Sequence, residues 1–177
     1  SLFQNHDGNS NSAFGHESLY SNTNGVSNTA VGYLALSSNT GGDFNTAIGY
    51  SALTSNIAGG SNVGIGNIAL FFNTIGSYNT AVGQYSLFYN TEGNQNTAVG
   101  SNSLQQNTLG TNNTAIGDSS LLNNVTGNYN TAGGSQAMYS NTVGYGNTAF
   151  GYKAMESTTT GHQNVAIGDT CQLLGGR

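Results

Sequence analysis

The sequence is poor in reactive and charged residues. It contains one cysteine, Cys171, no proline and no tryptophan, and only 5% of its 177 residues are charged, against about 25% in an ordinary soluble domain. A single cysteine excludes a disulfide framework or a thiolate metal cluster within one chain. The lack of proline excludes a collagen-like triple helix, although there are 27 glycines.

The charge balance argues against anionic partners. Lys153 and Arg177 are the only basic residues beside seven acidic ones, which gives a formal net charge of −5. Two cations cannot neutralise a phosphate backbone or an anionic membrane surface, so the sequence predicts no nucleic-acid partner. No apolar run approaches the roughly 18 residues of a membrane helix, so we expect no membrane insertion by this segment.

A 17-residue unit organises the chain. It opens with an asparagine and reads Asn-Thr-Ala-Val-Gly in the copy that starts at Asn28. The opening asparagines recur every 17 residues without insertion or deletion, at Asn11, Asn28, Asn45, Asn62, Asn79, Asn96, Asn113, Asn130, Asn147 and Asn164. A fixed short period is typical of repeat architectures, in which each unit is buried only by stacking on its neighbours. We number the positions of the unit from this asparagine as columns 1 to 17.

The period predicts three parts: a partial leading coil over 1–10, a ten-copy array over 11–170, and a junction or end of the repeat over 171–177. The chain opens on Ser1 in the middle of a unit, so we expect it to be a segment of a longer protein.

Two columns of the unit are glycine. Column 15 is glycine in every complete unit, from Gly25 to Gly161. Column 5 is glycine in all ten units: Gly15, Gly32, Gly49, Gly66, Gly83, Gly100, Gly117, Gly134, Gly151 and Gly168. Glycine permits a positive φ or a close backbone approach, so we interpret both columns as turns.

The apolar residues of each unit fall into two short segments, around columns 4 and 9. Segments of about five residues between turns are too short for helices and favour strands. The sequence therefore predicts an all-β fold, a parallel β-solenoid or β-roll of about ten 17-residue coils with two short strands per coil.

Strand alternation predicts which side chains face inward. Column 4, which is mostly Val, Ile or Phe, is expected inside together with the threonines of column 2, whose hydroxyls would bond from coil to coil. Column 3, which is Ala in nine units and Gly64 in the other, is then expected outside, and column 8 holds only Ala, Ser and Cys171. Outward columns restricted to such small residues predict a neighbouring subunit packed closely against them.

Asparagine also fills column 12 from Asn22 to Asn141. Stacked asparagines can form amide ladders along the axis. They can equally serve as turn residues that tolerate unusual backbone angles. Neither alternative implies catalysis.

These motifs resemble a known family. The strings Asn164-Val165-Ala166-Ile167-Gly168 and Ser61-Asn62-Val63-Gly64-Ile65-Gly66 are similar to head repeats of trimeric autotransporter adhesins of the YadA type, and to repeat arrays of phage or phage-derived tail fibres. The resemblance implies a β-roll, left-handed in the adhesins, that assembles as a homotrimer. The adhesin repeat is shorter, so the longer loops of this chain depart from the family.

No constellation of residues predicts catalysis, a metal site or a cofactor. Asp118 and Asp169 share column 6 but lie three coils apart, roughly 14 Å at the spacing of neighbouring strands, whereas a glycosidase needs two carboxyl groups about 5–9.5 Å apart. Only a site assembled between subunits would bring such groups closer. The three histidines, His6, His16 and His162, occupy different columns or distant coils. We expect no enzyme.

A cluster of aromatic residues is the candidate binding site. Column 10 holds Phe71 and Phe88 in adjacent units, and column 11 holds Phe72 and Tyr89 beside them. If alternation persists, at least one pair projects outward, where aromatic rings stack on sugars or anchor a partner. The alternative is that these rings fill a subunit interface or cover a loop.

The leading functional hypothesis is a structural or adhesive segment, stalk or head, of a trimeric fibre on a cell or virion surface. It would project a binding tip towards a glycan or protein of a host surface. The first alternative is an ice-binding solenoid that uses the threonines of column 2, which are Thr29, Thr46, Thr80, Thr97, Thr114, Thr131 and Thr148. The second is a polysaccharide-degrading tailspike.

Overall fold

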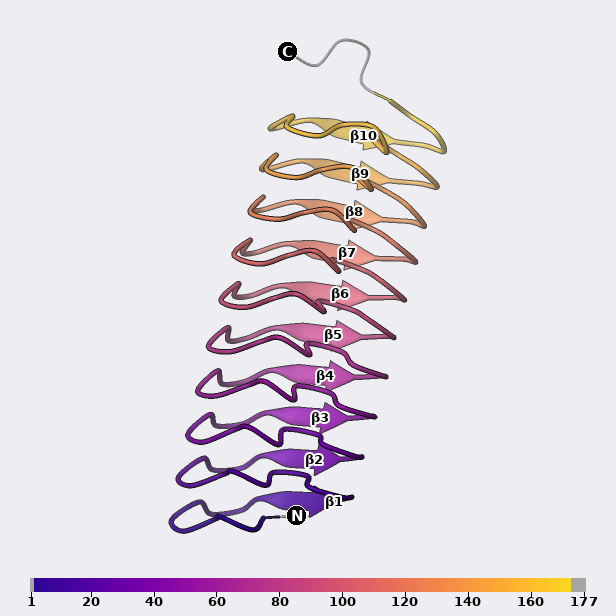
Figure 1. The fold of residues 1–177 in the computed structure, drawn as a ribbon. Coiled ribbons are helices and arrows are strands. Elements are labelled where there is room, and N and C mark those ends of the chain that lie inside the picture. Colours follow the sequence, from indigo (N-terminus) through magenta and orange to yellow (C-terminus); the bar gives the residue numbers. More distant parts are fainter. Residues whose placement is uncertain (1, 173–177) are drawn as a thin grey trace.

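The computed structural model describes residues 2–172 as a parallel β-solenoid of about nine turns (Figure 1). One three-residue strand recurs once per 17-residue unit, so ten strands span about nine full turns. The described residues contain no helix. The strands are β1 (Ser12–Phe14), β2 (Thr29–Val31), β3 (Thr46–Ile48), β4 (Val63–Ile65), β5 (Thr80–Val82), β6 (Thr97–Val99), β7 (Thr114–Ile116), β8 (Thr131–Gly133), β9 (Thr148–Phe150) and β10 (Val165–Ile167). Between residues 2 and 172, no helix of a length and polarity suited to crossing a membrane is found. Most of the predicted junction, residues 173–177, lies outside the described residues.

The ten strands form one parallel sheet in sequence order, and each unit pairs with the next in register. The N–H of Thr29 donates to the carbonyl of Asn45, and the N–H of Gly49 donates to the carbonyl of Val31, both at 2.8 Å. The uninterrupted 17-residue period explains this register, because every coil presents the same donors and acceptors to its neighbours.

The predicted second strand is wrong. The residues of columns 7 and 9 have φ near +50°, for example 56° at Leu34 and 52° at Leu36. Strands require negative φ, so this segment runs as a series of turns. It is still bonded between coils, since the N–H of Leu36 donates to the carbonyl of Ala52 at 3.0 Å.

The predicted orientation of the strands is also wrong. The alanines of column 3 from Ala30 to Ala166 are buried inside the chain itself, whereas Val, Ile and Phe of column 4 are exposed or half-buried on the outside. Column 8 is buried too from Ser18 to Ala154, together with the leucines and methionines of column 9, while Cys171 is half-buried. The small residues therefore line the interior of one chain, and they give no reason to expect a subunit packed against them.

The narrow interior explains why column 3 is small. At Gly64, an added Cβ would lie 3.3 Å from both Cγ and Cδ1 of Leu53 in the preceding coil. One leucine per coil already fills the cross-section, so a methyl group is the largest side chain that fits opposite it. The larger β-branched residues are left on the outer surface of the sheet.

The asparagine ladder is confirmed. The Asn39 amide donates to Oδ1 of Asn22 in the previous coil at 2.8 Å and to the carbonyl of Gly42 at 3.0 Å. That same carbonyl accepts from the amide of Asn28 at 2.8 Å. The two asparagines of each coil thus hold one turn carbonyl in the interior, where an unpaired polar group would be costly.

The two glycine columns have different physical causes. In column 5, φ lies between 127° and 136°, a region that residues with a side chain rarely adopt. Column 15 is governed by space, because a Cβ on Gly25 would lie 2.5 Å from Oδ1 of Asn22 and 2.5 Å from the carbonyl oxygen of Gly42.

Candidate functional site

The outer surface of the sheet is the first candidate. We call the side chains of columns 2 and 4 on β1–β10 the sheet face. Column 4 forms an apolar file broken only at Gly133: Phe14, Val31, Ile48, Ile65, Val82, Val99, Ile116, Phe150 and Ile167. The file spans nine strand spacings, about 43 Å. The sheet face carries no charged residue in any of its ten strands.

Column 2 contributes the polar half of the sheet face. Its threonines, replaced by Ser12, Val63 and Val165 in three strands, are half-buried or exposed. Their expected coil-to-coil hydroxyl bonds do not form within residues 2–172, where column 2 hydroxyls make no side-chain hydrogen bond. They point away from the core and are open to solvent.

The aromatic cluster is the second candidate. Phe72 and Tyr89, the column 11 pair, project outward with 39% of each residue exposed. Their rings stack on one another, parallel within 6° and with centroids 5.5 Å apart, so each ring covers part of one face of the other. The column 10 pair, Phe71 and Phe88, is half-buried and stacks at 5.6 Å. The structure thus places all four predicted residues together and assigns the outward position to column 11.

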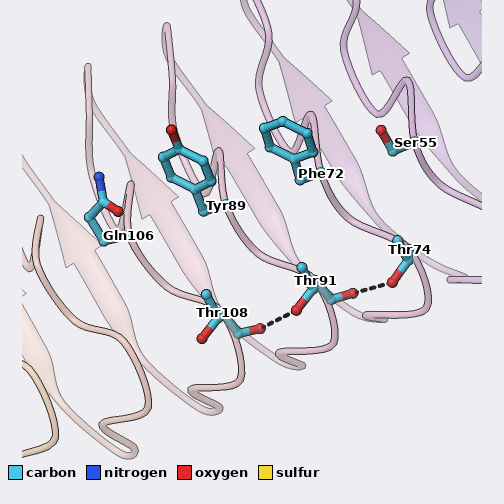
Figure 2. A pocket seen from close by; sticks show the side chains of 7 residues that line it. All are labelled: Ser55, Phe72, Thr74, Tyr89, Thr91, Gln106 and Thr108. Atoms are coloured by element: carbon cyan, nitrogen blue, oxygen red, sulfur yellow. Dashed lines mark hydrogen bonds between the residues drawn. The ribbon is translucent and has the colours of Figure 1, made fainter.

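An open cavity of about 500 Å³ adjoins the outward pair (Figure 2). We call it the aromatic groove; its lining residues are Ser55, Phe72, Thr74, Tyr89, Thr91, Gln106 and Thr108. None belongs to a strand, so the groove is separate from the sheet face. Its volume is in the range of about 300–1,000 Å³ that is typical of small-molecule sites.

A row of threonines forms the floor of the aromatic groove. Thr74 Oγ1 donates to the carbonyl of Thr91 at 2.9 Å, and Thr91 Oγ1 donates to the carbonyl of Thr108 at 3.2 Å (Figure 2). These hydroxyl protons are committed to the solenoid, so the row supplies methyl groups and oxygen lone pairs to the cavity. The sequence signal for this floor was the threonine that usually follows the column 12 asparagine; nothing pointed to Ser55 or Gln106.

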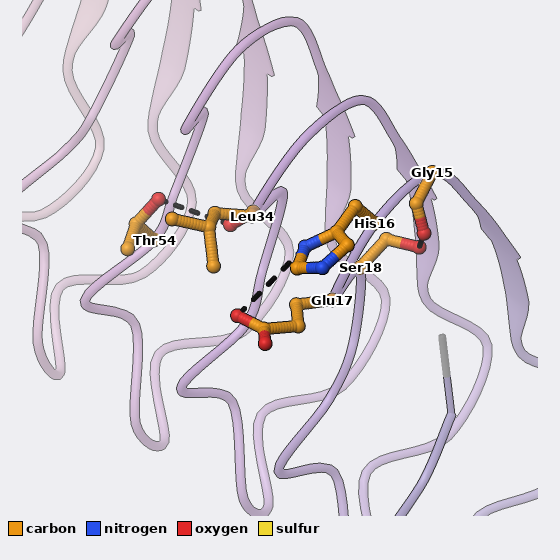
Figure 3. A network of polar contacts seen from close by, with 6 residues as sticks. All are labelled: Gly15, His16, Glu17, Ser18, Leu34 and Thr54. Carbon is orange, nitrogen blue, oxygen red and sulfur yellow. Dashed lines mark hydrogen bonds and ion pairs between the residues drawn. The ribbon is translucent and has the colours of Figure 1, made fainter.

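The ionisable residues serve local structure. His16 Nδ1 lies 4.0 Å from a carboxylate oxygen of Glu17, and Ser18 Oγ donates to the carbonyl of Gly15 at 3.1 Å (Figure 3). The His16 and Glu17 side chains are well exposed, so this contact contributes little to stability. Asp43 accepts the N–H of Val26 at 2.8 Å. No group of three potential metal ligands occurs among residues 2–172.

The contacts outside the groove include a three-ring stack and an ion pair. The Tyr33 ring stacks between His16 and Tyr50, with centroids 5.3 and 5.2 Å away. Lys153 Nζ lies 3.0 Å from a carboxylate oxygen of Glu156. The hydrogen bond to Glu156, followed by its charge, raises the pKa of Lys153 above its ordinary value. Neither arrangement assembles groups for catalysis.

Comparison of the chain with protein-family models, curated proteins and solved structures gives no match. Function is therefore inferred from the two surfaces themselves. These are the uncharged sheet face, with its apolar file, and the separate aromatic groove.

Proposed function

We propose that this chain is a structural segment of an extracellular fibre, and that copies of it associate through the sheet face into a homotrimer. The observation that supports the proposal is the apolar file of column 4. Exposed apolar patches of this extent usually mark an interaction surface. The file contains nine large side chains along one line, without a charge among them.

A second copy of the chain is the partner that fits this surface best. The file repeats once per coil, so another file of the same period can interdigitate with it along its whole length. Any array of stacked parallel strands has this spacing of about 4.8 Å, and a second copy of the chain is such an array with the same uncharged apolar file. The resemblance to trimeric adhesins and tail fibres supports three copies, and the stacked coils would supply a stiff spacer for a binding tip.

A measurement of mass in solution tests the proposal. Sedimentation equilibrium should give three times the chain mass of 18.1 kDa. A single chain mass at micromolar concentration would contradict assembly through the sheet face. Two chain masses would retain self-association but refute the trimer.

Ice binding is the second candidate, because the threonines of column 2 face solvent beside column 4 instead of the interior. They form a regular array of methyl and hydroxyl groups, one per strand except at Ser12, Val63 and Val165. This function requires the sheet face to stay free, whereas the fibre requires it to be buried. Thermal hysteresis in a monomeric sample would favour ice binding; its absence would leave the threonines as part of the fibre contact.

A further inference from the structure

We infer that the aromatic groove binds an uncharged pyranose glycan, whose sugar rings lie on Phe72 and Tyr89 while its hydroxyls reach Ser55 and Gln106. One chain forms the whole groove, and none of its residues belongs to the sheet face. The inference is therefore independent of assembly into a fibre.

The outward rings are not needed to form the coil. In seven other units, and in the partial leading coil, column 11 is a small or polar residue: Gln4, Ser21, Ser38, Ser55, Gln106, Asn123, Ser140 and Ser157; the tenth unit has Leu174, outside the described residues. Those seven units have the same backbone course as the two aromatic ones (Figure 1). The two adjacent aromatic residues are thus a local departure from the repeat, as expected for a site added to a structural scaffold.

The rings are held in place before any ligand arrives. Phe72 makes edge-on contacts with Phe71 at 4.7 Å and with Phe88 at 5.1 Å, measured between ring centroids. Tyr89 meets Phe88 in the same way at 4.6 Å, and Tyr85 meets Phe88 at 5.3 Å from another side. A platform supported in this way loses little conformational freedom on binding, which favours affinity.

The chemistry of the groove matches that of a neutral sugar. Aromatic faces carry partial negative charge and attract the polarised C–H groups on one side of a pyranose ring. The rim supplies the Ser55 hydroxyl, the Gln106 amide and the Tyr89 phenol, and none of these side chains has a hydrogen-bond partner in the described part of the chain. The seven lining residues include no acid and no base, so a charged sugar would find no counter-ion.

An extended peptide fits less well. Its backbone would cross the threonine floor, where the hydroxyl protons of Thr74, Thr91 and Thr108 are already donated to carbonyls of the solenoid. Peptide carbonyls lying there would be left without donors, at a cost of about 1–3 kcal/mol each. The hydroxyls of a sugar point to the rim instead, where free donors and acceptors lie.

The test uses the intact chain on an immobilised array of neutral and acidic glycans, with cellohexaose and maltohexaose as soluble probes. We expect binding to neutral glycans and transfer of NMR saturation from the protein aromatic protons to the bound sugar. In the wild-type protein, titration should shift the ring resonances of Phe72 and Tyr89 and leave those of Tyr78 unchanged.

Each variant introduces a residue that other units of the repeat already have in the same column. The double variant Phe72→Ser/Tyr89→Ser places in column 11 the serine that other units already contain, and it should weaken binding by roughly tenfold or more. The control Tyr78→Ser removes an equally aromatic but more exposed side chain outside the groove, from a column that holds Ser61 one coil earlier. It should bind like the wild type.

Three results would overturn the inference. These are no binding to any neutral glycan, equal binding by the double variant, or binding confined to acidic glycans. Failure of assembly is detected separately, by the mass in solution. A monomer that binds neutral glycan would therefore contradict the proposed fibre assembly but support glycan binding in the aromatic groove.

Discussion

The ring of Phe150 lies over Gly133, in the space that a β-carbon on Gly133 would occupy. These two residues are register partners on β9 and β8. Gly133 is the one gap in the column 4 file, and the neighbouring phenylalanine covers it. The large side chain of Phe150 thus fills the space left by the absent side chain of Gly133, and the sheet face stays continuous.

This compensation predicts an energetic coupling between the two positions. The change in the free energy of unfolding caused by Gly133→Val should be about 1–2 kcal/mol more favourable in a Phe150→Ile background than in the wild type. The added side chain no longer meets the phenylalanine ring there. The Val–Ile pair would then reproduce the one between Val31 and Ile48. A double-mutant cycle from urea denaturation measures the coupling, and strictly additive effects would show that the ring does not fill the gap.

The sheet face predicts a position-specific effect of charge on assembly. Ile116→Lys should raise the dissociation constant of the complex at least about tenfold, because an unpaired ammonium would be buried between chains. Leu109→Lys is the matched control, since Leu109 is 50% exposed and Ile116 is 51% exposed, but Leu109 lies outside the strands. Glu92 occupies the same column as Leu109 one coil earlier, so this column tolerates a charged side chain. Equal dissociation of both variants in sedimentation experiments would argue against the sheet face.

Gly83 in column 5 and Gly146 in column 17 predict two grades of backbone strain. A β-carbon at Gly83 would lie 2.5 Å from the carbonyl oxygen of Gly100, and φ there is 134°. Gly83→Ala should therefore destabilise the chain by about 3 kcal/mol or more. At Gly146, φ is 65° and the nearest atom is 3.6 Å away, so Gly146→Ala should cost only about 1 kcal/mol. Thermal unfolding of both variants compares them, and similar losses would refute the steric account.

The end of the asparagine ladder predicts a stabilising substitution. Oδ1 of Asn141 is buried and has no hydrogen-bond partner, because the next residue in its column is Thr158. Thr158→Asn would supply an amide donor and should raise the free energy of unfolding by about 1–2 kcal/mol.

Thr158→Asp is the control for the ladder, since an ionised carboxylate has nearly the shape of the amide but donates no hydrogen bond. It should destabilise, because it places a negative charge beside an unpaired acceptor. Chemical denaturation measures both variants. If asparagine and aspartate have the same effect, the ladder is not the cause.

The candidate site was accessible from the sequence only in part. Phe71, Phe72, Phe88 and Tyr89 were recognisable as two adjacent aromatic pairs, because the fixed period aligns them. Which pair points outward depends on the left-handed φ at Leu70 and Leu87, 52° and 49°, which interrupts simple strand alternation. Ser55 and Gln106 belong to the groove only because neighbouring coils bring column 11 together.

The sequence by itself determined the stacked coils and their register, because a unit of constant length repeats the same donors and acceptors at the same height. It left the amide ladder as one of two alternatives, and the structure decided for the ladder. The tertiary structure decided which side of each strand is the inside. Strand alternation and the apolar character of column 4 suggested that valine and isoleucine would be buried and alanine exposed. In the folded coil, Leu53 and its counterparts fill a cross-section so narrow that only alanine fits opposite them. The larger apolar residues are consequently excluded to the surface, where they form the sheet face.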